Sequence, residues 1–132
     1  MLDPDSQALK QFLFDHVETL EELQILVWFH RHAGASATDS QISEDTGISL
    51  VLVSEALERM ASSRMLSSDD SRPPAFRYEP AEAVVHETLQ QIFALYQDDP
   101  RTVIAVMTAN AIERLRASAM RAFAEAFRIR TN

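Results

Sequence analysis

Apolar residues recur at spacings of three and four along most of the chain, a pattern typical of amphipathic helices. Glycine occurs only twice, which agrees with a mostly helical protein. In the first half of the chain the pattern predicts four helices, each opened by a residue that can cap it. Their expected starts are at Asp5 or Ser6, after Thr19, after Thr38, and at Leu50 after the cap Ser49.

Two of these starts carry the capping-box pattern, in which a Thr hydroxyl and a Glu or Gln three residues later satisfy backbone N–H groups. They are Thr19 with Glu22 and Thr38 with Gln41. The short helix after Thr38 is expected to end at Gly47, where a left-handed residue is favoured. The next helix, residues 50–63, places apolar side chains on one face: Val53, Ala56, Leu57 and Met60.

A different pattern follows this helix. Residues 65–68 predict a short strand, residues 69–74 are polar and turn-forming, and residues 75–79 alternate around two aromatic side chains. The expected result is a β-hairpin directly after a helix, a tight turn and a second helix. The fold class predicted is therefore mainly α with a small β-hairpin.

Further helices are predicted in the remainder of the chain. One is expected from Pro80 to about Asp98, and a short apolar helix at residues 101–108 follows Pro100. Asn110 with Glu113 matches a third capping box, so we expect a break there and a separate last helix.

Length and composition narrow the class of protein. A chain of 132 residues is long enough to bury a core without disulfides, and cysteine is absent. The longest apolar runs are too short to span a bilayer, and the acidic N-terminus carries no signal-peptide pattern. The expected compartment is the cytoplasm.

Charge is distributed unevenly along the chain. The net charge is −8, yet residues 1–100 hold 18 acidic and 6 basic side chains, whereas residues 101–132 hold 2 acidic and 6 basic ones. Two interpretations remain open: a basic tail helix that lies on an acidic body, or a tail that binds an acidic partner.

The segment from Thr38 to Ser49, the amphipathic helix after it and the hairpin strand Phe76-Arg77-Tyr78 together resemble the winged helix-turn-helix domain of small bacterial transcription regulators. The resemblance covers about residues 18–80. It divides the chain into a winged helix-turn-helix core with an N-terminal helix, residues 1–80, and appended C-terminal helices, residues 81–132. By analogy with similar regulators, the extension is expected to form a homodimer.

The resemblance implies a DNA-binding site, with the second helix of the motif in the major groove and the wing on the backbone or minor groove. The implied groove-facing positions are Ser49, Leu50, Val51, Ser54, Glu55, Glu58, Arg59 and Ser62, and the implied wing positions are Arg72 and Arg77.

The charges on this helix depart from the usual pattern. Arg, Lys, Asn and Gln normally contact bases and phosphates, whereas this helix offers Glu55 and Glu58, which repel phosphates. Two functions therefore remain open. One is a dimeric DNA-binding transcription regulator, with Arg59 on the DNA. The other is a protein-interaction module whose acidic surface, with Leu50 and Val51, binds a protein and not DNA.

The sequence favours neither an enzyme nor a metal site nor a cofactor. His30 and His32 point to different faces of a helix, Asp69-Asp70 is expected at a solvated wing tip, and Trp28 with Phe29 is expected in the core. The apolar positions Ile112, Met120, Phe123 and Phe127 fit either a core or a self-association seam. On the same helix Arg114, Arg121 and Arg128 share one face.

Overall fold

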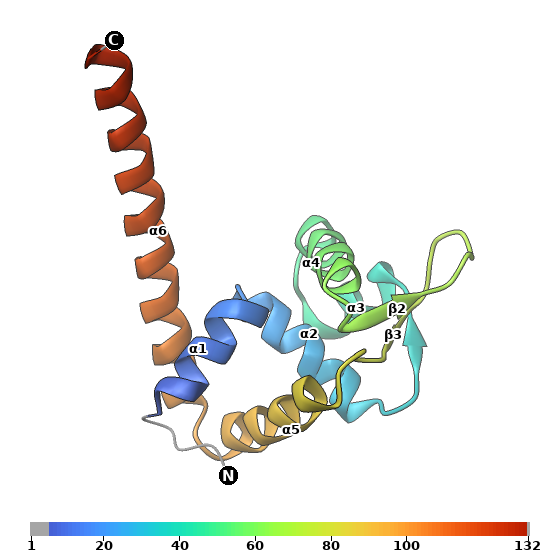
Figure 1. Ribbon diagram of the computed structural model, residues 1–132. Coiled ribbons are helices and arrows are strands. Elements are labelled where there is room, and N and C mark those ends of the chain that lie inside the picture. Colours follow the sequence, from blue (N-terminus) through green and yellow to red (C-terminus); the bar gives the residue numbers. More distant parts are fainter. Residues whose placement is uncertain (1–5, 132) are drawn as a thin grey trace.

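The computed structural model describes residues 6–131, with side chains as far as residue 128. Within this range the chain forms six helices and a small three-stranded antiparallel sheet (Figure 1). This confirms the predicted mainly helical fold with a small hairpin. The elements are α1 (Gln7–His16), α2 (Leu20–Arg31), β1 (Ser36–Ala37), α3 (Asp39–Thr46), α4 (Leu50–Ser62), β2 (Leu66–Ser68), β3 (Phe76–Tyr78), α5 (Ala83–Asp98) and α6 (Pro100–Thr131).

Local capping explains why α3 and α4 are separate helices. The capping box at Thr38 and Gln41 is complete, as predicted. Gly47 ends α3 in the left-handed region at φ 76°, and Ser49 caps α4 by accepting a hydrogen bond from the Leu52 N–H. The Ser43 hydroxyl donates to the Ile48 carbonyl at 2.6 Å and so braces the turn between the two helices.

The sheet contains one strand that the sequence pattern did not predict. β3 lies in the centre, with β2 on one side and the two-residue strand β1 on the other. Ser36 pairs with Arg77, and Ala37 pairs with Phe76. A segment this short has no alternation of its own, so only its pairing with β3 makes it a strand.

The segment after α4 makes the next helix begin later in the chain than predicted. Arg64 adopts a left-handed φ of 65°, and Met65 N–H donates to the Met60 carbonyl, which together make a Schellman-type helix end. Backbone bonds then continue past β3, because the Ala81 N–H donates to the Arg64 carbonyl at 2.9 Å. The helix expected from Pro80 therefore begins three residues later, at Ala83.

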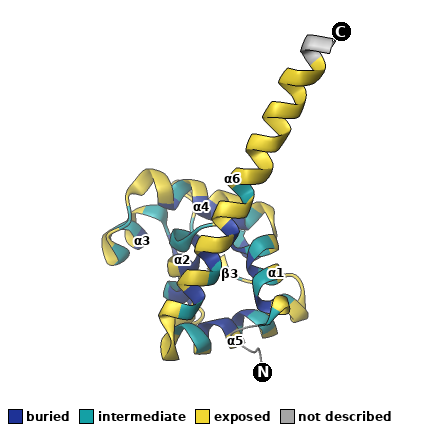
Figure 2. Cartoon of the chain, turned by 90° about the vertical axis from the view of Figure 1, so that its left-hand side faces the viewer, coloured by how far each residue is buried: buried dark blue, intermediate teal, exposed yellow. Residues whose placement is uncertain are grey.

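One cluster of buried apolar side chains joins all the helices. It includes residues of α1, α2, α4 and the hairpin, and it extends into α5 and the first two turns of α6 (Figure 2). Its largest fully buried members are Leu9, Leu13, Leu23, Ile25, Leu26, Phe29, Ile42, Leu57, Met60, Leu89 and Ile92. The expected core faces of α3 and α4 are thus confirmed.

The expected helix break at Asn110 is wrong. α6 is continuous over 32 residues, and its C-terminal half runs well past the rest of the molecule (Figures 1 and 2). The two residues of the predicted capping box contact α1 instead. The Asn110 Nδ2 donates to the Lys10 carbonyl at 3.1 Å, and the Glu113 carboxylate pairs with the Lys10 ammonium at 2.7 Å. Long-range contacts thus replace the local cap.

We expect Asn110→Asp to lower the free energy of unfolding by about 3 kcal/mol, because it removes the donor to Lys10 and buries a carboxylate. Asn110 is 1% exposed, and its Oδ1 has no partner among the described residues. Urea denaturation measures the change, with Ser118→Asp on the exposed part of α6 as the control. As a helix cap, Asp would serve as well as Asn, so an unchanged stability would contradict this role.

Candidate interaction surface on α4 and the hairpin

Helix α4 has one buried face and one exposed face. Val53, Ala56, Leu57 and Met60 pack into the core, whereas the first turn leaves Leu50, Val51 and Leu52 exposed, Val51 by 66%. We call the exposed side of this helix the α4 face. It consists of Ser49, Leu50, Val51, Leu52, Ser54, Glu55, Glu58, Arg59 and Ser62. The structure therefore brings together all the positions predicted on this helix.

Two of the three serine hydroxyls of the α4 face form hydrogen bonds within the protein. Ser49 Oγ accepts from the Leu52 N–H, and Ser54 Oγ donates to the Asp39 carboxylate at 2.6 Å. The second bond joins α4 to the start of α3 and holds the two helices in register.

Arg59, the cation of this helix predicted to contact DNA, pairs with a carboxylate from α2. Its Nε donates to Glu22 Oε1 at 3.1 Å, and the Glu22 side chain is only 2% exposed. Burial raises the pKa of Glu22 above its ordinary value of 4.5, and the positive charge of Arg59 opposes that rise. Arg59 thus compensates a buried negative charge, which is costly to leave unpaired.

The sequence pattern did not predict the contact of Glu22 with α4. Its position in a capping pattern pointed to a bond with the backbone of Thr19. The Thr19 hydroxyl does accept from the Glu22 N–H at 3.1 Å, but the carboxylate faces Arg59 instead. The pattern is therefore half confirmed, and only the fold could reveal the partner 37 residues away.

The remaining charged side chains of the α4 face are negative. Glu55 and Glu58 are both exposed, one turn apart. The helix therefore presents an apolar first turn followed by two carboxylates, and its one arginine, 47% exposed, already pairs with Glu22. Such a surface disfavours contact with phosphates and suits an apolar partner with positive charges at its edge.

The two predicted wing arginines lie on the hairpin. Arg77 is in the central strand, between Ser36 and Ser67 of the neighbouring strands, and Arg72 lies in the loop between β2 and β3. Both are exposed, and neither forms an ion pair with another described side chain. They are positive groups that the hairpin offers to a ligand.

The hairpin loop is organised by one carboxylate. Asp69 accepts from the backbone N–H groups of Ser71 and Ala75, each at 3.0 Å, and from the Ser71 hydroxyl. These hydrogen bonds, that of the Ser71 hydroxyl above all, lower the pKa of Asp69 below 3.8. The exposed loop position was predicted for Asp69, but its bracing role was not.

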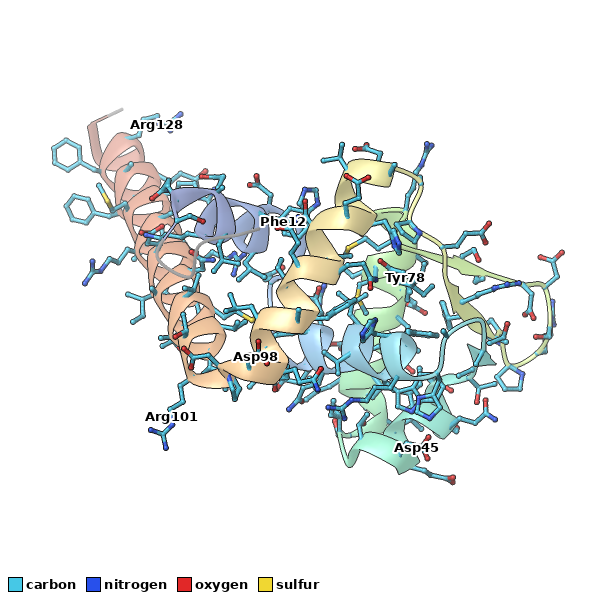
Figure 3. The ribbon with its side chains drawn as sticks, turned by 90° about the horizontal axis from the view of Figure 1, so that it is seen from below. Phe12, Asp45, Tyr78, Asp98, Arg101 and Arg128 are labelled. Carbon is cyan, nitrogen blue, oxygen red and sulfur yellow. The ribbon has the colours of Figure 1, made fainter. Side chains whose placement is uncertain are left out.

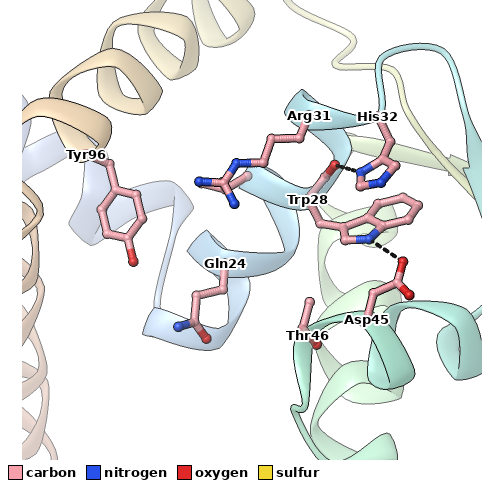
Figure 4. A pocket seen from close by; sticks show the side chains of 8 residues that line it. Gln24, Trp28, Arg31, His32, Asp45, Thr46 and Tyr96 are labelled. Carbon is pink, nitrogen blue, oxygen red and sulfur yellow. Dashed lines mark hydrogen bonds between the residues drawn. The ribbon is translucent and has the colours of Figure 1, made fainter.

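A separate groove of about 490 Å³ lies between α2, α3 and α5 (Figure 4). Trp28 forms its wall: the indole Nε1 donates to Asp45 at 2.9 Å, and the ring stacks on His32 with 4.1 Å between centroids. Tyr96 of α5 lies across the groove from Trp28, and Arg31 of α2 also lines it. Phe29 is buried as predicted, whereas Trp28 is only half-buried at the edge of the core.

Neither this groove nor any other part of the described chain contains a group of His, Asp or Glu side chains arranged to hold a metal ion. Among residues 6–131, no helix has both the length and the apolar character that crossing a membrane requires. Comparisons with protein-family models, curated proteins and solved structures gave no match.

We expect Arg59→Met to lower the free energy of unfolding by about 2 kcal/mol at pH 7, because Glu22 loses its counter-charge. The sign of the pH dependence follows from the raised pKa of Glu22. The contribution of Glu22 to stability is fully present below pH 4.5, which is the pKa of this group in the unfolded chain. The contribution is lost as pH rises through the pKa of Glu22 in the folded chain. Removing Arg59 raises that folded pKa further, so the deficit should grow between pH 5 and pH 7.

Urea denaturation at both pH values checks this expectation. Arg77→Met, which removes an arginine without a carboxylate partner, is the matched control. Adding Glu22→Gln to Arg59→Met should recover most of the loss. A deficit that is independent of pH, or that Glu22→Gln leaves unchanged, would show that the pair does not act as described.

Proposed function

We propose that residues 18–80 form a winged-helix domain and that its α4 face binds a protein partner. The order of elements supports the winged-helix assignment: a helix, a short edge strand, two helices joined by the Gly47 turn, and a hairpin. The observation that carries the choice of partner is the pairing of Arg59 with buried Glu22, beside the exposed Leu50, Val51 and Leu52.

Electrostatics favour a protein over a nucleic acid at this face. Affinity of a protein for duplex DNA without sequence preference comes almost entirely from cations that neutralise phosphates. Residues 36–64 carry five acidic and two basic side chains, and one of the two, Arg59, already pairs with Glu22. A duplex that approached α4 would meet Glu55 and Glu58 first.

The chemistry of the face indicates the class of partner. Leu50, Val51 and Leu52 offer adjacent apolar contacts at the start of α4, and the carboxylates of the following turns lie beside them. The best-matched partner is a protein segment with apolar side chains flanked by Lys or Arg. The proposed compartment of this interaction module is the cytoplasm.

DNA binding by a transcription regulator is the second candidate function. It is favoured by Arg72 and Arg77, which are exposed on the hairpin and form no ion pair within the described chain. In this alternative the hairpin contacts the sugar–phosphate backbone of the DNA, and the helix brings Ser49, Val51 and Glu55 close to the base edges.

A titration of labelled mixed-sequence duplex, followed by fluorescence anisotropy over a salt series, separates the two functions. For the natural chain we expect no binding tighter than about 10⁻⁴ M, even at low salt. Glu55→Lys with Glu58→Lys should create affinity that weakens steeply as salt rises, because the fold then presents cations to the groove. Salt-dependent binding by the natural chain, lost in Arg72→Ala/Arg77→Ala, would establish the DNA alternative instead.

A direct test of partner binding places a photo-crosslinking amino acid at Val51 of the full chain in its native cells. We expect a specific adduct from this position and none from Glu87, an exposed residue on α5. The affinity of the chain for the purified partner should fall as salt rises. Val51→Asp should lower this affinity further. Equal adducts from both positions, or an affinity indifferent to Val51→Asp, would count against the α4 face.

A further inference from the structure

From Ile112 onward, α6 carries a stripe of large apolar side chains on its solvent side. Their exposed fractions lie between 45% and 73%. We call this set the α6 stripe; it consists of Ile112, Leu115, Met120, Phe123 and Phe127. Of the two possibilities left open for Ile112, Met120, Phe123 and Phe127, a place in the chain's own core does not hold, because all four are exposed.

The contacts of α6 with α1 explain why the stripe faces outward. Asn110 and Glu113 contact Lys10, and the Arg114 guanidinium donates to the Phe14 and Glu18 carbonyls while lying 4.6 Å from the Phe14 ring centroid. These contacts hold one side of the helix against α1. Ile112 and Leu115 lie on the other side, and Phe123 follows them at helical spacing.

The stripe is large enough to form a specific interface. At roughly 200 Å² per large side chain, the exposed fractions leave about 600 Å² of apolar surface on each chain. Complete burial of two such stripes against each other would cover about 1,200 Å², the lower end of stable protein–protein interfaces. Ala119 and Ala126 lie among the large residues and allow two helices to approach closely.

A second apolar feature lies near the N-terminal end of α6, which we call its foot, directly before the first residue of the stripe. A groove of about 250 Å³ lies between α6 and the start of α2. We call it the foot groove; it is lined by Glu18, Thr19, Leu20, Ile104, Met107, Thr108 and Ala111. Its walls are mainly apolar side chains, and Glu18 gives one edge a negative charge.

We propose that a second copy of this chain covers the α6 stripe, with the two α6 helices packed antiparallel around Ala119. In this arrangement residue 127 of one chain lies beside Ala111 of the other, because each is eight residues, or about 12 Å, from the crossing point. The aromatic end of each stripe then reaches the foot groove of its partner. This surface is distinct from the α4 face, so the proposal stands independently of the proposed function.

Charge selects the antiparallel arrangement over the parallel one. Residues 1–100 carry a net charge of −12 and residues 101–132 carry +4. Arg101 and Arg128 lie at opposite ends of α6 (Figure 3). A parallel pair would place two acidic bodies side by side, whereas an antiparallel pair separates them and brings each basic helix end toward the partner's acidic body.

Sedimentation equilibrium of the full chain tests the association. We expect a mass near twice 14.9 kDa for the natural chain. Phe123→Lys should weaken dimerisation at least about tenfold, whereas Ser118→Lys, an exposed position off the stripe, should not. Circular dichroism shows whether each variant keeps its helix content. A natural chain that stays monomeric, or a dimer indifferent to Phe123→Lys with its helices intact, would overturn the proposal.

Disulfide trapping tests the relative orientation of the two α6 helices. The chain has no native cysteine, so only the introduced cysteines can form disulfides. Mixing chains that carry Ile112→Cys with chains that carry Ala126→Cys should give the mixed disulfide as the main product. Self-linked pairs as the main product would indicate parallel packing and overturn the antiparallel arrangement. Monomers that instead bind anionic phospholipid vesicles through Phe123 would assign the stripe to a membrane surface and also overturn the proposal.

Discussion

A single buried carboxylate determines what the exposed surface of this protein can be. Glu22 lies almost without solvent between α2 and α4, and Arg59 is the cation that compensates it. Because this arginine pairs with Glu22 while 47% of its own side chain stays exposed, Glu55 and Glu58 on the exposed side of α4 are left without a paired cation among the described residues. The need of buried Glu22 for a positive counter-charge therefore affects which charges the exposed side of α4 offers to a partner.

The described chain carries two exposed apolar surfaces of different character. The α4 face is short, borders two carboxylates and lies on the helix that follows the Gly47 turn. The α6 stripe is long and lies on a helix with an excess of arginine. Such surfaces are uncommon on chains that act alone. A chain that pairs through α6 would present its α4 face twice, once from each end of the pair.

Much of this architecture follows from local sequence. The turn at Gly47, the capping box at Thr38 and the apolar positions of α4 act over a few residues, so their pattern predicts them correctly. The errors concern residues whose partners are distant in the chain. Glu22 and Asn110 both occupy capping patterns, yet their side chains contact Arg59 and Lys10, 37 and 100 residues away. A polar side chain that matches a cap can equally serve a long-range contact, and only the packing of helices decides between them.

The attachment of α1 to α6 has a consequence for how the chain reaches this structure. α1 packs chiefly against α6, and its polar contacts there join residues about 100 positions apart. During synthesis the chain grows from its N-terminus. Leu9 and Leu13 therefore emerge long before the residues that cover them, and α1 can complete its docking only after Arg114 has left the ribosome. The first helix to be made therefore completes its packing only when most of the chain has been synthesised.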